Sequence, residues 1–257
     1  MYRVATLRGG LAWALIFSRA PVTGRRQVDG QPVVSVRRAS GPARAVALVL
    51  HGGAEHGLAR VGPWRLAYLR MVPLAKALHR AGRAAGLEVR LVRNRRYGWN
   101  APAEDPVDDA RWALERIRAE HPGLPVVLIG HSMGGRVVLR VADDPAVVGV
   151  CALAPWTPPG EPADAVAGRS VVLLHGTRDR ITSPRDSHAF AERARALAKR
   201  LARFEVVGEG HAMIRRPAVW TRLMCAFTLE AIDAGETDET LRQAWNRPAD
   251  ERLRLPV

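Results

Sequence analysis

Gly130-His131-Ser132-Met133-Gly134-Gly135 is the stretch that decides the fold, because its G-x-S-x-G motif lies between an apolar run at 125–130 and a helical pattern at 133–142. A strand before the motif and a helix after it are what this motif requires. The glycines two residues before and after Ser132 remove side chains that would crowd a tight turn. The sequence therefore predicts a strained turn that presents the Ser132 hydroxyl, with the Met133 N–H directed at a developing oxyanion. An ordinary glycine-rich turn with an incidental serine is the alternative.

On both sides of this motif, short apolar runs alternate with longer amphipathic runs. This alternation predicts a mostly parallel sheet covered by helices on both faces. Pro73 is expected to kink or divide its helix. We expect strands at 33–37, 45–50, 88–92, 125–130, 147–153, 171–175 and 203–207, and helices at 64–83, 107–120, 133–142, 184–200 and 217–234. Residues 1–257 are interpreted as one domain, with 1–30 as an N-terminal segment and 235–257 as a polar surface appendage that holds a short helix at 238–245.

A serine hydroxyl is a weak nucleophile unless a base takes its proton. His211 is the predicted base, because Gly208-Glu209-Gly210-His211 follows the last expected strand. His56 is its rival, since it lies in a loop expected to border the site. The remaining histidines are interpreted as structural groups beside glycine turns (His51, His131, His175) or as surface groups (His79, His121, His188).

The base needs a carboxylate that fixes its tautomer and stabilises the imidazolium. Asp179 is the predicted carboxylate, because it ends His175-Gly176-Thr177-Arg178-Asp179 directly after a strand. It also gives the chain order Ser, Asp, His. Asp186 is the nearby alternative, but it falls inside the following helix.

A second backbone donor for the oxyanion is expected in the loop after the strand at 45–50. His51-Gly52-Gly53-Ala54 occupies this position, and its two glycines allow a sharp turn. Gly53 is the preferred donor and Ala54 the second choice, while an ordinary tight turn is the alternative interpretation.

On these residues the sequence resembles the α/β-hydrolase superfamily over nearly all of 33–234. The matching stretches are 51–53, 130–135, 175–179 and 208–211, in the order typical of that family. The resemblance implies an α/β class protein with the α/β-hydrolase fold, a mostly parallel central sheet of about eight strands. It also implies acyl-transfer chemistry, but it does not identify the substrate.

The sequence departs from many of these relatives in the stretch where they carry a helical cap. Here 155–170 is short and holds four prolines, so no sizeable cap domain is expected. The site should therefore be open, and Tyr97, Trp99 and Trp156 are candidate substrate-binding residues. Packing between loops is an equally good explanation for these three aromatic residues.

The net charge of +14 raises the question of a nucleic-acid or membrane partner. Arginine carries almost all of the positive charge and is spread along the whole chain, which favours a coding bias over a binding stripe. Cys151 and Cys225 are interpreted as small buried hydrophobes, and their low number fits a reducing compartment. The apolar run at 11–17 is too short to span a membrane. We therefore expect a cytoplasmic protein without a nucleic-acid partner, and the sequence leaves the oligomeric state open.

Together these features predict a serine hydrolase that cleaves carboxylic ester or thioester bonds through an acyl-enzyme, without a metal or an organic cofactor. Amidase, lipase and perhydrolase activities stay open as variants of the same chemistry. A ligand-binding or receptor-like protein on the same fold is the alternative from another functional class, and an electrostatic binder of nucleic acid or membrane is the third.

Overall fold

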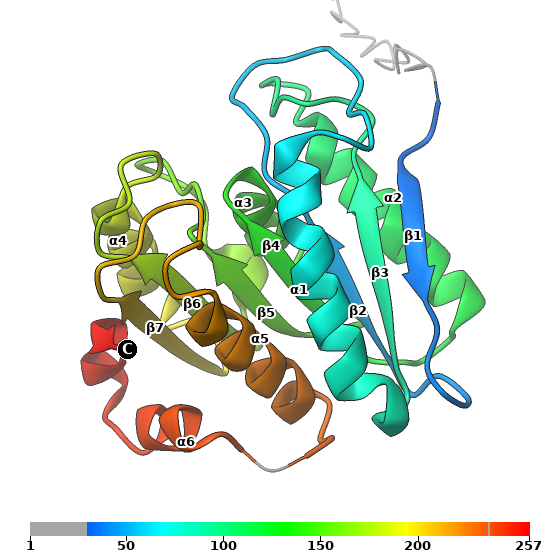
Figure 1. Ribbon diagram of the computed structural model, residues 1–257. Helices are drawn as coiled ribbons and strands as arrows, with labels where there is room; N and C mark the ends of the chain where they lie inside the picture. The colour runs from blue at the N-terminus through cyan, green and yellow to red at the C-terminus, as the bar shows by residue number, and fades with distance from the viewer. Residues whose placement is uncertain (1–29, 236) are drawn as a thin grey trace, which may run out of the picture.

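The computed structural model describes residues 30–235 and 237–257, and within these ranges eight strands form one sheet (Figure 1). The strand order is β1-β3-β2-β4-β5-β6-β7-β8. β1 runs antiparallel to β3, whereas the other neighbouring strands pair in parallel, so the expected mostly parallel sheet is confirmed. The bounds are β1 (Val33–Arg37), β2 (Ala45–Leu50), β3 (Leu87–Arg93), β4 (Val126–His131), β5 (Val147–Leu153), β6 (Ser170–Gly176), β7 (Arg200–Val206) and β8 (Leu255–Pro256).

The helices cover both faces of this sheet. α1 and α5 lie side by side on one face, and α2, α3 and α4 cover the other (Figure 1). Central strands such as β2 are buried at every position, which explains their continuous apolar sequence. The helices are α1 (Leu66–Gly82), α2 (Asp105–Glu120), α3 (Met133–Arg140), α4 (Pro184–Ala194), α5 (Pro217–Ala231) and α6 (Glu239–Trp245), and the 3₁₀ turns are η1 (Arg83–Ala85), η2 (Asp164–Val166) and η3 (Ala249–Leu253).

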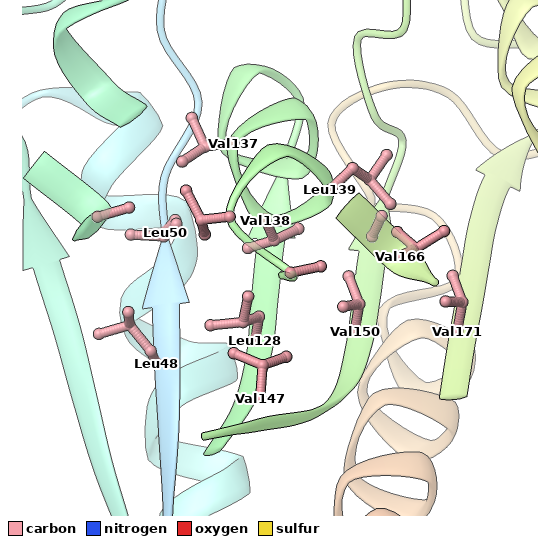
Figure 2. Packing of buried hydrophobic residues seen from close by; sticks show 14 of the residues in the cluster. Leu48, Leu50, Leu128, Val137, Val138, Leu139, Val147, Val150, Val166 and Val171 are labelled. Carbon is pink, nitrogen blue, oxygen red and sulfur yellow. The ribbon is translucent and has the colours of Figure 1, made fainter. Parts of the chain in front are cut away.

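The packing of α3 against the middle of the sheet fixes the position of the motif that precedes this helix. Val137 and Val138 of α3 and Leu50 and Leu128 of the sheet belong to one buried cluster (Figure 2). Since α3 begins directly after Ser132, this packing holds the turn at the carboxyl end of β4.

Three elements differ from the sequence-based expectations. α1 is one helix through Pro73, so the proline does not divide it; Pro73 is exposed and leaves the buried face of the helix intact. α4 ends at Ala194, six residues before its expected end, because Arg200 already begins β7 beside Ser170. The C-terminal residues differ from the expected surface appendage. Their last strand, β8, joins the sheet next to β7, and Leu241, Leu253 and Leu255 are buried.

The segment between β5 and β6 is short and builds no cap domain. Residues 154–169 contain one 3₁₀ turn, η2, and otherwise follow an irregular path. In the described part of the chain, no helix combines the length and apolar character needed to cross a lipid bilayer. Residues 1–29 of the N-terminal segment expected at 1–30 lie outside the described residues.

Candidate active site

Ser132 lies in the tight turn between β4 and α3, with φ 58° and ψ −119°. Glycine is obligatory on both sides of this turn. A Cβ at Gly130 would collide with the Gly134 carbonyl oxygen, and a Cβ at Gly134 would lie 2.6 Å from the His51 carbonyl oxygen. The turn therefore brings the backbones of β2, β4 and α3 together at the carboxyl end of the sheet.

His211 and Asp179 meet Ser132 in one hydrogen-bonded line. The His211 Nε2 atom lies 3.0 Å from the Ser132 Oγ, and the His211 Nδ1 atom lies 2.8 Å from the Asp179 Oδ2. Ser132 follows β4, Asp179 follows β6, and His211 follows β7, so three different strand ends supply the three groups. Ser132 is 8% exposed and the His211 side chain is 13% exposed, whereas the Asp179 side chain is fully buried.

Asp179 is held in its ionised form by the groups around it. Its Oδ1 accepts hydrogen bonds from the Ile181 and Thr182 N–H groups at 2.8 and 3.0 Å. Burial by itself would raise the pKa of Asp179, but hydrogen bonds with His175, His211 and the Ile181 N–H hold this pKa far below its ordinary value. A carboxylate that stays charged suits the orientation and stabilisation of an imidazolium at His211.

Two backbone N–H groups beside this turn have no acceptor in the described part of the chain. In residues 30–235 and 237–257, the N–H groups of Gly53 and Met133 make no hydrogen bond within the protein. The Ala54 N–H, the second choice from the sequence, already donates to the Tyr97 carbonyl oxygen at 3.1 Å. Gly53 has to be glycine, because a Cβ there would collide with the Tyr97 carbonyl oxygen and lie 2.5 Å from the Met133 Cε.

His51 and His131 hold the backbone on which the site rests. His51 donates from Nδ1 to the Gly52 carbonyl at 2.5 Å and accepts at Nε2 from the Asn94 N–H at 3.1 Å. His131 donates from Nε2 to the His211 carbonyl oxygen at 3.0 Å. Burial lowers the pKa of His51 to about 4 and that of His131 to about 3, so both rings are neutral anchors at pH 7.

The three aromatic candidates for substrate binding have different surroundings. Tyr97 and Trp156 are half-buried, whereas Trp99 is only 2% exposed and meets Trp156 edge to face at 6.0 Å. The Arg136 guanidinium lies over the Trp99 ring at 3.8 Å and over the Trp156 ring at 4.6 Å. Trp99 therefore packs in the core, and Tyr97 and Trp156 are the more accessible of the three candidates.

The rival residues lie outside the Ser132–His211–Asp179 line. The His56 side chain is 76% exposed and lies 3.9 Å from Glu55. Asp186 lies in the first turn of α4, where its N–H donates to the Ser183 hydroxyl at 3.1 Å. Neither residue contacts Ser132 or His211.

Three further residues support the site, and of these only His175 had a role predicted from the sequence, as a structural group. The Thr182 hydroxyl donates to the Asp179 Oδ2 at 3.0 Å, and the His175 Nε2 lies 3.3 Å from the same atom. Buried Glu209 accepts from the N–H groups of Gly210, Arg215 and Arg216, and so closes the loop that carries His211. The one sequence signal for Glu209 is its position in Gly208-Glu209-Gly210-His211, where it is a charged residue two positions before the predicted base.

Comparisons with known proteins identify the same architecture. An α/β serine hydrolase homologue from Coxiella burnetii aligns with a TM-score of 0.59 and 17% identity, over 76% of this chain and 90% of that one. XC6422 from Xanthomonas campestris, described as an α/β serine hydrolase without lid, aligns with a TM-score of 0.56 and 20% identity, over 80% and 91%. Est1E from Butyrivibrio proteoclasticus aligns with a TM-score of 0.57 and 14% identity, over 79% and 95%.

These structural likenesses establish the fold, and no curated protein matches the chain. The sequence itself matches the family described as "Alpha/beta hydrolase family" over residues 47–257, a range that contains every residue of the site described above. With its eight-stranded sheet, its turn at Ser132 and this match over most of its length, the chain belongs to the alpha/beta hydrolase family.

Proposed function

We propose that this protein is a serine hydrolase that cleaves carboxylic esters or thioesters, with Ser132 as nucleophile, His211 as general base and Asp179 as its carboxylate partner. The observation that carries the proposal is the line from the Ser132 Oγ through His211 to Asp179, with separations of 3.0 and 2.8 Å. Both separations lie within the range that proton transfer and its support require.

In the first half of the reaction, the Ser132 Oγ attacks the ester carbonyl carbon while the His211 Nε2 takes the hydroxyl proton. The carbonyl π electrons move to oxygen, and the Gly53 and Met133 N–H groups stabilise this oxyanion. One such donor contributes on the order of 10²–10³ in rate. The oxyanion then collapses, and the protonated His211 donates its proton to the leaving alcohol or thiol.

In the second half, water replaces the leaving group. His211 removes a proton from the water as it attacks the acyl carbon, and then returns the proton to the Ser132 Oγ as the acid leaves. Asp179 stays charged throughout, because its hydrogen bonds and partners hold its pKa far below the ordinary value. Its role is to orient Nδ1–H and to stabilise the imidazolium.

The walls of the site and the chemistry of the leaving group favour esters and thioesters as substrates. Half-buried Tyr97 and Trp156 supply apolar walls for an acyl or alcohol group. Alkoxide and thiolate leaving groups need less assistance than an amine, and the protonated His211 supplies the proton they need. The resemblance to structures described as esterases agrees with this choice.

A fluorophosphonate probe tests the proposal directly. Purified wild-type protein is expected to form a 1:1 covalent adduct at Ser132 and to hydrolyse p-nitrophenyl acetate, whereas Ser132→Ala should do neither while keeping its circular dichroism spectrum. Asp186→Ala, a change outside the Ser132–His211–Asp179 line, is the control that should keep both activities. Absence of labelling in the folded wild-type protein would indicate a receptor-like protein instead.

A further inference from the structure

An apolar groove lies between α1, the loop that follows His211 and the start of α5. Figure 1 shows α1 and α5 side by side on the same face of the sheet. The groove has a volume of about 430 Å³, which is within the size range of small-molecule sites. Its apolar wall includes Leu66, Leu69, Pro73, Met213, Ile214 and Trp220.

The rim of this groove exposes more apolar surface than isolated surface residues usually do. The Leu66 and Ile214 residues are 77% and 75% exposed, and both line the groove from opposite sides. Trp64, which is 82% exposed, precedes Leu66 by two residues. Large apolar side chains gathered at a concave surface are typical of a ligand-binding site.

Arg70 brings an unpaired positive charge to this apolar wall. It is half-buried and lines the groove, and among the described residues no carboxylate or carbonyl oxygen pairs with its guanidinium. The three buried arginines, by contrast, each contact a glutamate: Arg90 with Glu88, Arg136 with Glu161 and Arg203 with Glu205. A guanidinium against apolar surface without an acceptor attracts an anion.

Trp220 adds a second unsatisfied donor to the same wall. Its side chain is fully buried, and in the described part of the chain its indole N–H has no hydrogen-bond acceptor. A buried indole N–H usually finds a partner. The Trp220 indole N–H is itself buried, so Arg70 is the polar group that an oxygen of an occupant can reach in this groove.

We propose that this groove binds the anion of a single-chain amphiphile, a medium-chain alkyl carboxylate. Its carboxylate pairs with Arg70, and its alkyl chain lies between α1 and the 212–214 loop, against Leu66 and Ile214. The site is separate from the catalytic line, because neither Ser132 nor His211 lines the groove. The inference goes beyond the proposed function and does not depend on it.

Isothermal titration calorimetry with hexanoate, octanoate and decanoate tests the proposal on the full-length protein. We expect one binding site, with affinity rising up to about fourfold for each added methylene that the groove covers. Arg70→Gln should weaken octanoate binding by about tenfold or more and leave octan-1-ol binding unchanged, because only the charge-assisted hydrogen bonds are removed. Arg70→Lys should restore part of the affinity.

Two further variants give the test its controls. Arg80→Gln makes the same charge change on the same helix outside the groove, and should bind octanoate like the wild type. Leu66→Gln should weaken the binding of both octanoate and octanol. Equal octanoate affinity in Arg70→Gln and wild type, or no binding by the wild type, overturns the proposal.

The catalytic and groove sites are distinguished by blocking Ser132. Protein already labelled with the fluorophosphonate, and the Ser132→Ala variant, should both bind octanoate with unchanged affinity. Loss of octanoate binding on labelling would place the ligand at the catalytic site and overturn the groove proposal. If the wild-type protein binds octanoate but is not labelled by the fluorophosphonate, the groove proposal is supported and the hydrolase proposal is contradicted.

Discussion

Ser132 adopts a backbone conformation that costs a non-glycine residue on the order of 1–3 kcal/mol. The surrounding backbone holds it there. The Ser132 N–H donates to the Leu153 carbonyl at 3.0 Å, and the Trp156 N–H donates to the Ser132 carbonyl at 3.0 Å. The end of β5 and the segment that follows it therefore hold the turn through the Ser132 N–H and carbonyl groups, with the hydroxyl at hydrogen-bond distance from His211.

At the scale of single residues, we predict that Ser132 and His211 act as one unit. Ser132→Ala and His211→Ala should each lower kcat for p-nitrophenyl acetate by a factor on the order of 10⁶, and the double variant should be hardly slower than either. The reason is that the base has no proton to take once the hydroxyl is gone. Steady-state kinetics of the three variants measure this.

His56→Ala provides the contrast for this cycle, because His56 is exposed and lies outside the hydrogen-bonded line. It should keep wild-type kcat. A dead His56→Ala with an active His211→Ala would transfer the role of base to His56. Losses that multiply in the double variant would contradict cooperation between Ser132 and His211.

Motifs at strand ends made the three principal residues predictable, since Ser132, Asp179 and His211 each follow an apolar run and a glycine turn. Thr182 and His175 were not predictable as partners of Asp179. Their roles depend on how the loop after β6 folds back, with Thr182 donating to the Asp179 carboxylate. The burial of Trp99 was not predictable for a related reason, because nothing in the local pattern shows that Arg136 covers its ring.

At the scale of elements, the C-terminal strand β8 is part of the sheet. The Val257 N–H donates to the Glu205 carbonyl, and the Val207 N–H donates to the Val257 carbonyl, both at 3.0 Å. The buried Arg203 also donates to the Leu253 carbonyl at 3.0 Å. The end of the chain is therefore tied to β7 by backbone and side-chain hydrogen bonds.

We predict that Leu253→Ala lowers the free energy of unfolding by about 2–4 kcal/mol, because Leu253 is 3% exposed and its truncation leaves a cavity. Urea denaturation followed by circular dichroism measures the change. Arg254→Ala, at the exposed neighbouring position, should change the unfolding free energy by less than about 1 kcal/mol. A cost for Leu253→Ala as small as that of Arg254→Ala would mean that the tail is a surface appendage after all.

Periodicity predicted the elements whose burial is set by their own sequence. β2 and β5 begin and end where the apolar runs do. The end of α4 and the role of β8 were not predictable, because both depend on a partner strand far away in the chain. Residues 195–199 keep a helical composition but connect to β7, and the polar tail shows only isolated leucines at 241, 253 and 255.

At the scale of the whole molecule, a short fixed segment takes the place of a cap. Glu161 accepts hydrogen bonds from Arg136 at 2.7 Å and from Arg140 at 2.5 Å, which ties residues 155–169 to α3. Because of these contacts, we expect no opening of this segment as a lid. The proposed acyl site should therefore be short and open to solvent, next to half-buried Tyr97 and Trp156.

We predict that kcat/KM for p-nitrophenyl esters rises over the first few acyl carbons and then levels off or falls. Each methylene that the site covers contributes about 0.8 kcal/mol, or about fourfold, and methylenes beyond the site contribute nothing. The chain-length series from acetate to palmitate measures this. A continued rise to long chains, or a jump in rate at the solubility limit of the ester, would show that the site is longer or is opened at an interface.

Buried titratable groups make the stability of the whole molecule depend on pH in a defined direction. Burial lowers the pKa of His51 to about 4 and that of His131 to about 3, and it also lowers the pKa of His175. An unfolded histidine titrates near pH 6.5. Below this pH these histidines bind protons in the unfolded chain but not in the folded chain, which favours unfolding. Their contribution to the free energy of unfolding is therefore complete above pH 6.5 and decreases as the pH falls.

Asp109 acts in the opposite direction, because burial raises its pKa to about 6. Between pH 6 and 5 the folded chain protonates Asp109 while the unfolded chain does not, so this group adds stability as the pH falls. Each group contributes at most about 1.4 kcal/mol per pH unit. The contributions of His51 and His131 together, less the opposing contribution of Asp109, lower the free energy of unfolding by about 1.4 kcal/mol for each unit of pH decrease. His175 adds to this decrease.

We therefore predict that the free energy of unfolding falls by at least about 1 kcal/mol per pH unit between pH 6 and 5, where ordinary carboxyl groups are mostly ionised in both states. Urea denaturation at half-unit intervals measures this slope. Asp109→Asn should steepen the slope, since it removes the opposing group, and His51→Gln should flatten it, whatever either substitution costs in stability at pH 7. A wild-type slope near zero, or one that His51→Gln leaves unchanged, would mean that the buried imidazoles take up protons in the folded protein as readily as in the unfolded chain.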